Sequence, residues 1–454
     1  MKYRDALNYI YSFTNFEVTP ANTYSSKTFD LTRMERLLAA LGNPHTKFKS
    51  VHVAGTKGKG STAAMIESIL HTAGYSTGLY TSPHLHTFRE RIRVDGKIIS
   101  QDDLVAGVEK IKSVVAQIPD VTAFEVMTAL AFDHFAARGV EFAVLEVGLG
   151  GRLDATNVVT PLVSVLTSIS YDHMAILGNT LAQIASEKAG IIKPGIPVVS
   201  SPQKDEARVV VEQVAQEKNA PLVQISDFRF QISDLTFQIT PSASNLGGQT
   251  FQLVKLSEPN LQPVTCNLKL LGKHQLSNAA TALAAISVLR AHGIAVSDDA
   301  MREGIRNVEW HGRFELLARA PYLIVDGAHN ADSSRQLVAT LHEFFPSARL
   351  HFVFGVSGDK DIAAIFRELL PHAASLILTR SHNPRAADPA RLAELAAQYS
   401  VETLMQSDLG NAIQVGMQRA GQNDVVCVTG SLFVVAEARE LVLAQRGINV
   451  ETDN

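Results

Sequence analysis

A glycine-rich segment near the start of the chain, Gly55-Thr-Lys-Gly-Lys-Gly-Ser61, has the residue types of a phosphate-binding loop. Its glycines let backbone N–H groups turn toward an anion, and Lys59 adds a positive charge beside them. An apolar strand pattern from Val51 precedes the segment, and a helical pattern from Ser61 to His71 follows it. The helix N-terminus would add its partial positive charge, so the segment predicts a site for a nucleotide phosphate.

The spacing of this loop departs from the common pattern G-x-x-x-x-G-K-[ST]. Two residues separate Gly55 from Gly58, and Gly60 stands between Lys59 and Ser61. A glycine-rich turn between a strand and a helix can also be a tight corner that binds nothing. The strand, the glycines, the lysine, the hydroxyl and the helix nevertheless occur together in the right order, which favours a phosphate loop.

Three further polar side chains lie where predicted strands end: Ser82, Glu146 and His173. The carboxyl ends of parallel strands meet at one edge of an α/β sheet, and ligands bind at this edge. Mg²⁺ in nucleotide sites needs few protein ligands, because waters and phosphate oxygens complete its shell. The three side chains therefore predict a Mg²⁺ site beside the phosphate loop, although histidine is a less usual Mg²⁺ ligand than oxygen.

Each of these side chains also has an ordinary structural interpretation. Ser82 precedes a proline and could simply begin a turn. Glu146 could pair with Arg152, since an unpaired buried carboxylate is costly. A lone histidine such as His173 is usually structural. Only the convergence of all three beside the phosphate loop favours metal binding.

A second polar group follows a strand pattern in the last third of the chain, in Val325-Asp-Gly-Ala-His-Asn330. Asp326 and His329 could reach a nucleotide, or Asp326 could only start a helix. Arg313 follows a glycine-containing stretch at Trp310 and could hold phosphates as two domains close. On spacing alone, a surface arginine is the better interpretation of Arg313.

The alternation of strands and helices predicts an α/β protein with two arrays that meet near Trp310. Residues 203–265 differ, because their short alternating runs predict an antiparallel excursion. Strand patterns lie at Gly78–Thr81, Glu141–Val147, Leu162–Ile169, Pro197–Ser200, Tyr322–Val325, Leu350–Phe354, Ser375–Leu378 and Val425–Val428, and helical patterns at Phe124–Ala137, Thr180–Ala189 and Gln275–His292.

Length and composition limit the class of protein. A chain of 454 residues is too long for one core of ordinary size, and its 46% hydrophobic and 19% charged residues are typical of a folded soluble protein. The net charge of −4 gives no reason to expect nucleic acid or an anionic membrane as a partner. Cys266 and Cys427 form no metal-binding pair. Without a signal-peptide core or a membrane-spanning apolar stretch, we expect a cytoplasmic protein.

Taken together, these motifs resemble the folylpolyglutamate synthase and dihydrofolate synthase family of ATP-dependent amide ligases, which are relatives of the Mur cell-wall ligases. The matching segments occur in the order of the family and spread over most of the chain. They are Gly55–Ser61, Ser82–Leu85, Glu146–Asn157, Asp172–His173, Leu177–Gly178, Glu187–Ile191, His274–Gln275, Asn278, Gly312–Phe314, Asp326–Asn330 and Thr429–Ser431.

The resemblance implies an α/β fold with a central parallel-sheet, P-loop ATPase domain over residues 1–309 and a smaller, Rossmann-like C-terminal domain over residues 310–454. Catalysis would take place in the cleft between them. ATP would be bound by Gly58, Lys59, Gly60, Ser61, Asn278, Arg313 and Asp326, and Mg²⁺ by Ser82, Glu146 and His173.

The resemblance also assigns positions to the other substrates and to the chemistry. A pterin substrate would contact Thr23, Tyr24, Ser25, Ser26, Thr122, Ala123, Phe124, Glu125, Leu153, Asp154 and Ala155. His329 and Ser431 match positions associated with the incoming glutamate, and Lys188 matches a lysine that is carbamylated in relatives. Lys59, Lys188 and His329 are therefore the expected catalytic residues. Lys57 departs from the family, which often has asparagine there, and its charge should strengthen phosphate attraction.

The implied reaction joins L-glutamate to a folate or dihydropteroate carboxylate. The carboxylate attacks the γ-phosphate of ATP, and the amine of glutamate then displaces phosphate from the acyl phosphate. The partners would be these small molecules and ATP, with Mg²⁺ as cofactor, and the protein would act as a monomer.

A regulatory ATPase that makes no bond is the alternative from another class of protein. A Mur-type enzyme acting on a sugar-nucleotide peptide lacks support, because the residues before 55 leave little room for a separate sugar-nucleotide domain. Whether the chain uses dihydropteroate, folates or both is left open by the sequence.

Overall fold

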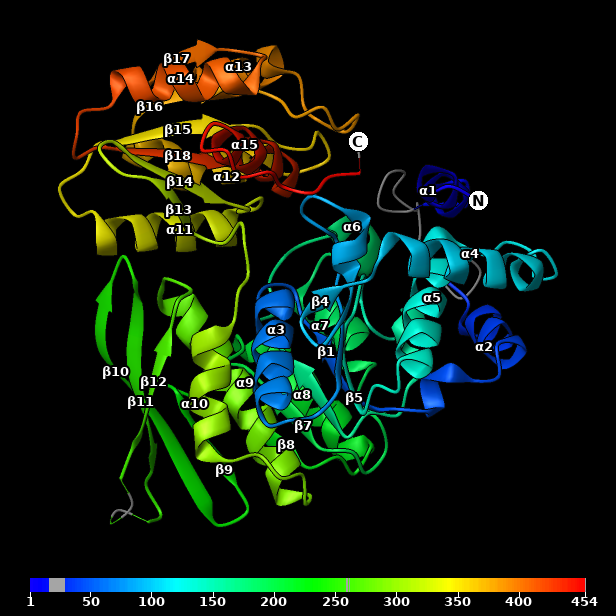
Figure 1. Ribbon diagram of the computed structural model, residues 1–454. Coiled ribbons are helices and arrows are strands. Elements are labelled where there is room, and N and C mark those ends of the chain that lie inside the picture. Colours follow the sequence, from blue (N-terminus) through cyan, green and yellow to red (C-terminus); the bar gives the residue numbers. More distant parts are fainter. Residues whose placement is uncertain (16–28, 259, 261, 454) are drawn as a thin grey trace.

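Three sheets organise the chain in a computed structural model that describes residues 1–15, 29–258, 260 and 262–453 (Figure 1). The first two sheets and the helices around them form what we call the first domain, and the third sheet with its helices forms the second domain. The segment between helix α10 (Asp298–Asn307) and strand β13 (Glu315–Ala318) connects the two. We propose that the boundary falls at residues 309 and 310 within this segment.

The first sheet has eight strands in the order β4-β3-β2-β5-β1-β6-β7-β8. From β2 to β8 along this order, neighbouring strands run parallel, whereas β3 and β4 join the edge antiparallel. The strands are β1 (Lys49–Ala54), β2 (Thr77–Tyr80), β3 (Ile92–Val94), β4 (Lys97–Ile98), β5 (Phe142–Glu146), β6 (Val163–Leu166), β7 (Val198–Ser200) and β8 (Leu222–Gln224). Central strands such as β5 are buried throughout, which explains their continuous apolar sequence.

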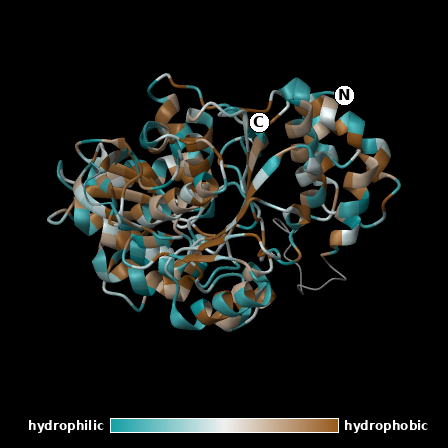
Figure 2. Ribbon diagram, turned by 90° about the horizontal axis from the view of Figure 1, so that it is seen from below, coloured by the Kyte–Doolittle hydropathy of each residue, from teal (hydrophilic) through white to brown (hydrophobic). Residues whose placement is uncertain are grey.

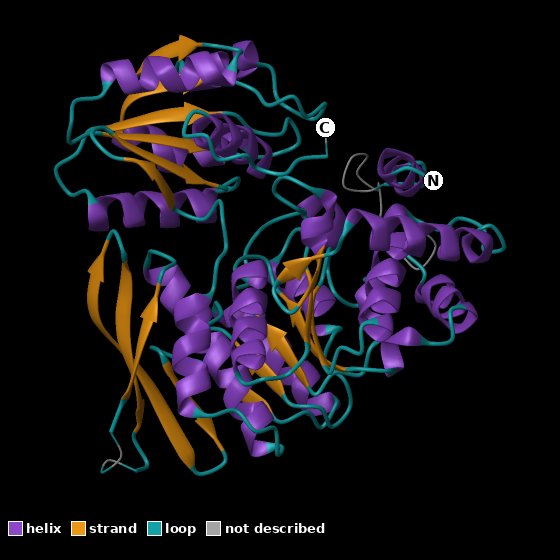
Figure 3. Cartoon of the chain, in the orientation of Figure 1, coloured by secondary structure: helices purple, strands orange, loops and turns teal. Residues whose placement is uncertain are grey.

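Helices cover both faces of the first sheet (Figure 3). On one face, α3 (Lys59–Thr72), α9 (Lys273–Ala291) and α10 share a core with the sheet. On the other face lie α1 (Tyr3–Tyr11), α2 (Leu31–Ala40), α4 (Gln101–Val115) and α5 (Ala123–Ala137). The helices α6 (Met174–Leu177), α7 (Leu181–Ala189) and α8 (Asp205–Glu217) follow β6 and β7. Figure 2 shows hydrophobic strands inside and hydrophilic residues along the outer helices and loops.

The second sheet is antiparallel, in the order β12-β11-β10-β9. It consists of β9 (Arg229–Ile232), β10 (Leu235–Asn245), β11 (Gly248–Lys255) and β12 (Val264–Leu268). The predicted antiparallel excursion is therefore confirmed for its later part. It is wrong for residues 205–224, where α8 and the parallel strand β8 complete one more α/β unit of the first sheet.

The third sheet has the order β13-β14-β18-β15-β16-β17, parallel except for the edge strand β13. Its other strands are β14 (Tyr322–Asp326), β15 (Leu350–Phe354), β16 (Ala373–Leu378), β17 (Glu402–Met405) and β18 (Val425–Thr429). The helices α11 (Ala331–Phe344), α12 (Ile362–Leu369) and α13 (Pro389–Ala396) pack in one core, and α14 (Leu409–Arg419) and α15 (Leu432–Ala444) in another. The sequence patterns did not predict the edge strands β13 and β17.

The predicted strands and helices are confirmed, with ends that differ by at most three residues. Side-chain caps explain several helix starts: Thr122 and Glu125 form a capping box at α5, and Thr180 and Gln183 form one at α7. Among the described residues, no helix combines the length and the apolar composition that a membrane crossing requires. The α/β class with a large parallel sheet is thus the architecture that the sequence predicts.

The close approach of α10 to α3 yields a stability test. A Cβ atom at Gly304 would lie 2.5 Å from the Ile69 Cα atom, so backbone would have to move. We expect Gly304→Ala to lower the free energy of unfolding by about 1–3 kcal/mol, even though alanine favours helix. Gly410→Ala in α14 is the matched control, because its nearest neighbour is the Asp408 side chain at 3.3 Å. Urea titration should give a lower midpoint of unfolding for Gly304→Ala than for the parent protein, and an unchanged midpoint for Gly410→Ala. Equal midpoints for Gly304→Ala and the parent protein would contradict the prediction.

Candidate active site

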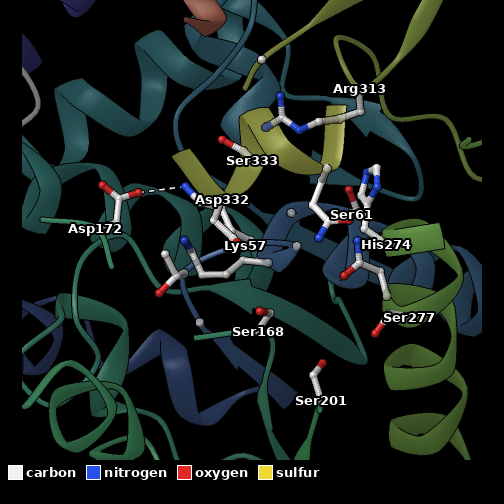
Figure 4. Close-up of a pocket in the computed structure, with 18 of the residues that line it drawn as sticks. Lys57, Ser61, Ser168, Asp172, Ser201, His274, Ser277, Arg313, Asp332 and Ser333 are labelled. Atoms are coloured by element: carbon white, nitrogen blue, oxygen red, sulfur yellow. Dashed lines mark hydrogen bonds and ion pairs between the residues drawn. The ribbon is translucent and has the colours of Figure 1, made fainter. Parts of the chain in front are cut away.

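One cavity of about 670 Å³ lies between the two domains and gathers most of the predicted functional residues. The carboxyl ends of parallel strands from both sheets supply its walls, as expected for α/β sheets. Figure 4 shows side chains from both domains around it, with Arg313 at one end of the view and Ser201 at the other. Predicted site residues that line it are Gly58, Lys59, Gly60, Ser61, Ser82, Glu146, His173, Lys188, Asn278, Arg313, Asp326 and His329.

The phosphate loop connects β1 to α3, as its sequence predicts. Gly58 precedes the helix with a φ of 86°, a left-handed conformation that glycine adopts without strain. A Cβ atom there would lie 2.2 Å from the Asn278 Oδ1 atom, and one at Gly60 would lie 2.6 Å from the Trp310 ring. The loop is therefore held between α9 and the segment that joins the domains, and bulkier residues would displace it.

Glu146 ends β5 and is buried beside the phosphate loop. Its Oε2 atom accepts a hydrogen bond from the Ser82 backbone N–H at 3.1 Å, and its Oε1 atom lies 3.9 Å from the Lys59 Nζ atom. Burial raises the pKa of Glu146, whereas Lys59 acts to lower it. Arg152, the alternative partner, pairs with Glu187 at 2.8 Å. Glu146 thus brings Ser82 and Lys59 together at the cavity.

His173 directly precedes α6, and its backbone has a φ of 50°. Desolvation by the surrounding protein lowers its pKa to about 3, and lysines including Lys360 act in the same direction. A neutral imidazole can donate a lone pair to a metal. Among the described residues, no three His, Cys, Asp or Glu side chains converge as a ready-made metal site. A cation beside Ser82, Glu146 and His173 would accordingly need further oxygens from a substrate or from water.

Asp172 joins the two domains through an ion network. Its Oδ2 atom accepts from the Lys57 Nζ atom at 2.8 Å and from the Asn330 Nδ2 atom at 3.0 Å, and its Oδ1 atom accepts from the Lys360 Nζ atom at 3.3 Å. Burial acts to raise the pKa of Asp172, but the charge of Lys57 and the other cations around the carboxylate hold it well below its usual range. The carboxylate is therefore charged, and lysines from both domains hold it.

Lys188 is buried at the end of α7, with its Nζ atom donating to the Gly55 carbonyl at 2.9 Å. Desolvation lowers its pKa to about 7, and the neighbouring Lys59 contributes in the same direction. Lys188 is therefore not a solvated lysine, although it stands at the end of a helix. The amine faces the cavity beneath the phosphate loop and is partly neutral near pH 7.

The second domain contributes Arg313, Asp326 and His329 from the opposite wall. Asp326 is buried at the end of β14, and its carboxylate accepts from the backbone N–H groups of Phe314 at 2.8 Å and Ala328 at 2.9 Å. Burial raises the pKa of Asp326, whereas Arg313 lowers it. His329 donates from Nδ1 to the Gly327 carbonyl at 2.8 Å, so its Nε2 atom faces Lys57 at 3.4 Å. Arg313 lines the cavity and is no solvated surface residue.

The predicted pterin-binding segments lie beside the cavity, apart from its lining residues. Phe124 touches the glycine turn after β5, because a Cβ atom at Gly148 would lie 2.5 Å from its ring. Glu125 accepts from the Thr122 N–H at 2.7 Å and pairs with Arg33 at 3.1 Å. Leu153, Asp154 and Ala155 follow that turn, where buried Asp154 accepts from Leu149 N–H at 2.9 Å. Thr23, Tyr24, Ser25 and Ser26 lie outside the described residues.

Other residues show where sequence patterns were insufficient. Ser431 caps α15 by accepting from the Val434 N–H at 3.2 Å, next to Leu432, which lines the cavity. Lys360 and Asn330 were not predicted, although both follow strand ends of the second domain, a position that marks candidates. Phe228, which lines the cavity from the turn before β9, gave no signal in the sequence because its role depends on how the second sheet folds back.

Two domain families match the chain and agree with this arrangement. Residues 53–286 match the family described as Mur ligase middle domain, and residues 312–432 match Mur ligase, glutamate ligase domain. The phosphate loop in one and the facing cations in the other define an ATP-dependent, amide-forming ligase of the Mur class. Residues 287–311, which include α10, lie between the two matched ranges.

Comparison with similar proteins identifies the family within this class of ligases. The chain is 37% identical over 445 residues to the Bacillus subtilis dihydrofolate synthase/folylpolyglutamate synthase, which covers 96% of this chain and 98% of that protein. Its fold is similar to folylpolyglutamate synthase of Mycobacterium tuberculosis complexed with ADP, with a TM-score of 0.85, 32% identity, and 97% and 98% of the two chains covered. An Escherichia coli structure in complex with DHPP and ADP gives a TM-score of 0.83 and 32% identity, with 98% and 99% covered. The chain belongs to the dihydrofolate synthase/folylpolyglutamate synthase family of Mur ligases.

The geometry at Glu146 and His173 predicts the effect of removing either donor. Glu146→Gln and His173→Ala should each lower turnover about 100-fold or more if both serve Mg²⁺ at the phosphates. Neither side chain belongs to an apolar core, so circular dichroism and thermal unfolding should show a folded protein. Arg152→Gln, which removes a nearby but exposed charge, is the control. A turnover near that of the parent enzyme would remove the substituted residue from the metal site.

Proposed function

We propose that this chain catalyses the ATP-dependent addition of L-glutamate both to dihydropteroate and to reduced folates, through an acyl-phosphate intermediate. One observation supports this most strongly: a phosphate loop and a facing arginine, aspartate and histidine line one cavity in a chain that aligns almost end to end with bifunctional relatives. An enzyme with only one of the two activities is the alternative within the family.

The residues of the phosphate loop would hold the ATP phosphates. Backbone N–H groups of Gly58, Gly60 and Ser61 lie at the start of α3, and Lys59 adds charge where the γ-phosphoryl group transfers. Arg313 would neutralise phosphate charge from the second domain. Because this reaction needs mainly positioning and electrostatic stabilisation, charged and N–H groups that the fold already directs at the cavity suit it.

The donor set fits a magnesium ion. Glu146 presents a buried carboxylate whose Oε1 atom lies beyond hydrogen-bond distance of Lys59, so it retains a lone pair for a cation. Ser82, Glu146 and the neutral His173 would hold the ion, which would neutralise charge on the transferring phosphoryl group when bound. Asn278 and Asp326 would contact the nucleotide, from α9 and from the end of β14.

The second step requires glutamate beside the acyl phosphate in a site without water. His329 and Ser431 stand on the second domain, so closure of that domain would bring the amine to the acyl carbon and exclude water, which would hydrolyse the intermediate. Thr122–Glu125 and Leu153–Ala155 lie beside the cavity and would hold the pterin. The structure solved with DHPP supports such a pocket in the Escherichia coli relative.

Lys188 would act as a carbamate. The neutral amine present near pH 7 can add CO₂ through its nitrogen and release a proton, which gives a carbamate anion with two oxygens. A buried anion beneath Lys59 and the proposed Mg²⁺ would be stabilised there, whereas an ammonium would be repelled. We also propose that the protein acts as a monomer in the cytoplasm: the cavity is complete within one chain, and Cys266 and Cys427 are buried free thiols.

The proposed activities are tested by assaying dihydropteroate and tetrahydrofolate separately. Amide product should form with each substrate, and ADP release should require both glutamate and the pterin substrate. Product from only one of the two would support the single-activity alternative. ADP release that needs neither glutamate nor a pterin would support a regulatory ATPase and contradict the proposal.

The carbamate makes Lys188 testable by substitution and by pH. Lys188→Ala should lose most of the ligase activity, and short carboxylic acids should restore part of it by supplying an anion. Because its pKa is lowered to about 7, protonation below that pH should slow the parent enzyme, and removal of bicarbonate should slow it further. Lys193→Ala, which removes the next lysine of the chain, whose Nζ atom donates to the Asn157 carbonyl at 2.8 Å, is the control. Full activity of Lys188→Ala would contradict the role.

A further inference from the structure

The segment after α15 leaves the second domain and returns to the first (Figure 1). There, Asp453 binds three donors: its Oδ1 atom accepts from the Tyr3 hydroxyl and from the Thr87 hydroxyl, each at 2.5 Å, and its Oδ2 atom accepts from the Phe88 backbone N–H at 2.6 Å. Glu451 forms an ion pair with Arg89 nearby. The last described residues therefore dock on the segment 82–91.

This segment, which we call the Ser82 loop, is separated from the end of β2 by one residue and carries a proposed Mg²⁺ ligand. Its ends are fixed to the first sheet, since Ser82 N–H donates to Glu146 at 3.1 Å and Thr81 N–H donates to the Arg91 carbonyl at 3.1 Å. Between them, the Glu90 carboxylate accepts from the backbone N–H groups of Leu85, His86 and Thr87 at 2.9–3.2 Å. Glu90 gives the loop one definite shape.

Helix α15 holds the same loop at a second point. The His86 Nδ1 atom lies 2.8 Å from the Glu440 carboxylate, and its Nε2 atom lies 3.1 Å from the Arg439 guanidinium. Arg439 also binds Glu315 of β13 at 2.9 Å. The second domain thus contacts the Ser82 loop at two points: from α15 itself, and from the segment that follows α15.

We propose that Asp453 is a positioning residue for the magnesium–nucleotide site: by holding Tyr3, Thr87 and Phe88, it couples the place of the second domain to the place of Ser82. The Phe88 N–H and the two hydroxyls would otherwise lack a charged acceptor, and hydrogen bonds to a carboxylate are stronger than neutral ones. Because Asp453 follows α15 in the chain, a movement of the second domain would reach the Ser82 loop through the segment that joins them. This inference rests on the role of Ser82 in the proposed function.

The test uses the full-length chain with Asp453→Ala, and with Asp299→Ala as the control, since Asp299 is an exposed aspartate whose ion pair lies within α10. Hydrogen–deuterium exchange should show faster exchange of the amides of residues 82–91 in Asp453→Ala only. The Mg²⁺ concentration that supports half-maximal ATP binding, measured by calorimetry, should rise about threefold or more, given the strength of hydrogen bonds to charged groups. Tyr3→Phe, which removes a single donor, should give a smaller rise.

Two results would overturn the proposal. Unchanged exchange of residues 82–91 would show that Asp453 does not hold the loop. Faster exchange with an unchanged Mg²⁺ requirement would show that the loop does not position the metal site. Thermal unfolding of each variant distinguishes these outcomes from general destabilisation, which would accelerate exchange throughout the chain. The binding readout requires no turnover, so absence of ligase activity in the parent protein would refute the proposed function independently.

Discussion

The charged carboxylate of Asp172, held between Lys57 of one domain and Lys360 of the other, is the interaction on which the site depends. The ends of parallel strands converge on the cavity and bring several cations together, including Lys59, which would repel one another without anions among them. A carboxylate in this position satisfies two ammonium groups at once. It thereby fixes the phosphate loop and the second domain in one arrangement, at a place where an unpaired buried charge would be costly.

The same balance of charge explains the differing protonation of neighbouring groups. Asp172 has several donors, and its pKa is held low despite burial. The buried amine of Lys188 donates to the neutral carbonyl of Gly55, and desolvation lowers its pKa to about 7. The pKa values of two groups in one cavity are thus shifted for different reasons: cations around Asp172 favour its charged form, whereas desolvation disfavours the charged form of Lys188. The lysine is therefore the group that can lose its proton near pH 7.

Rigidity and movement are divided between the two domains. The phosphate loop is held tightly, with Gly58 against Asn278 and Gly60 against the Trp310 ring, so it offers phosphates a preformed site. The second domain meets the first through polar contacts at the Asp172 network, the His86–Glu440 pair and the Asp453 cluster, and through apolar contacts at Leu85 and Leu271. Polar contacts of this kind resemble transient interfaces, which allow domain movement more readily than large apolar ones do. Such a division suits a reaction that needs closure around a hydrolysable intermediate and opening for product release.

The sequence alone determined the features that short-range patterns carry. The glycine-rich loop, the apolar strands and the capped helices follow from local conformational preferences and periodicity, so Gly58, Lys59 and Glu146 were found from the residues themselves. The tertiary structure decided what depends on contacts between distant segments. Residues more than a hundred positions apart, such as Lys57 and Asp172 or Phe88 and Asp453, meet only after the sheets have formed. The burial that makes Lys188 partly neutral likewise has no local signal, because desolvation is a property of the surrounding fold.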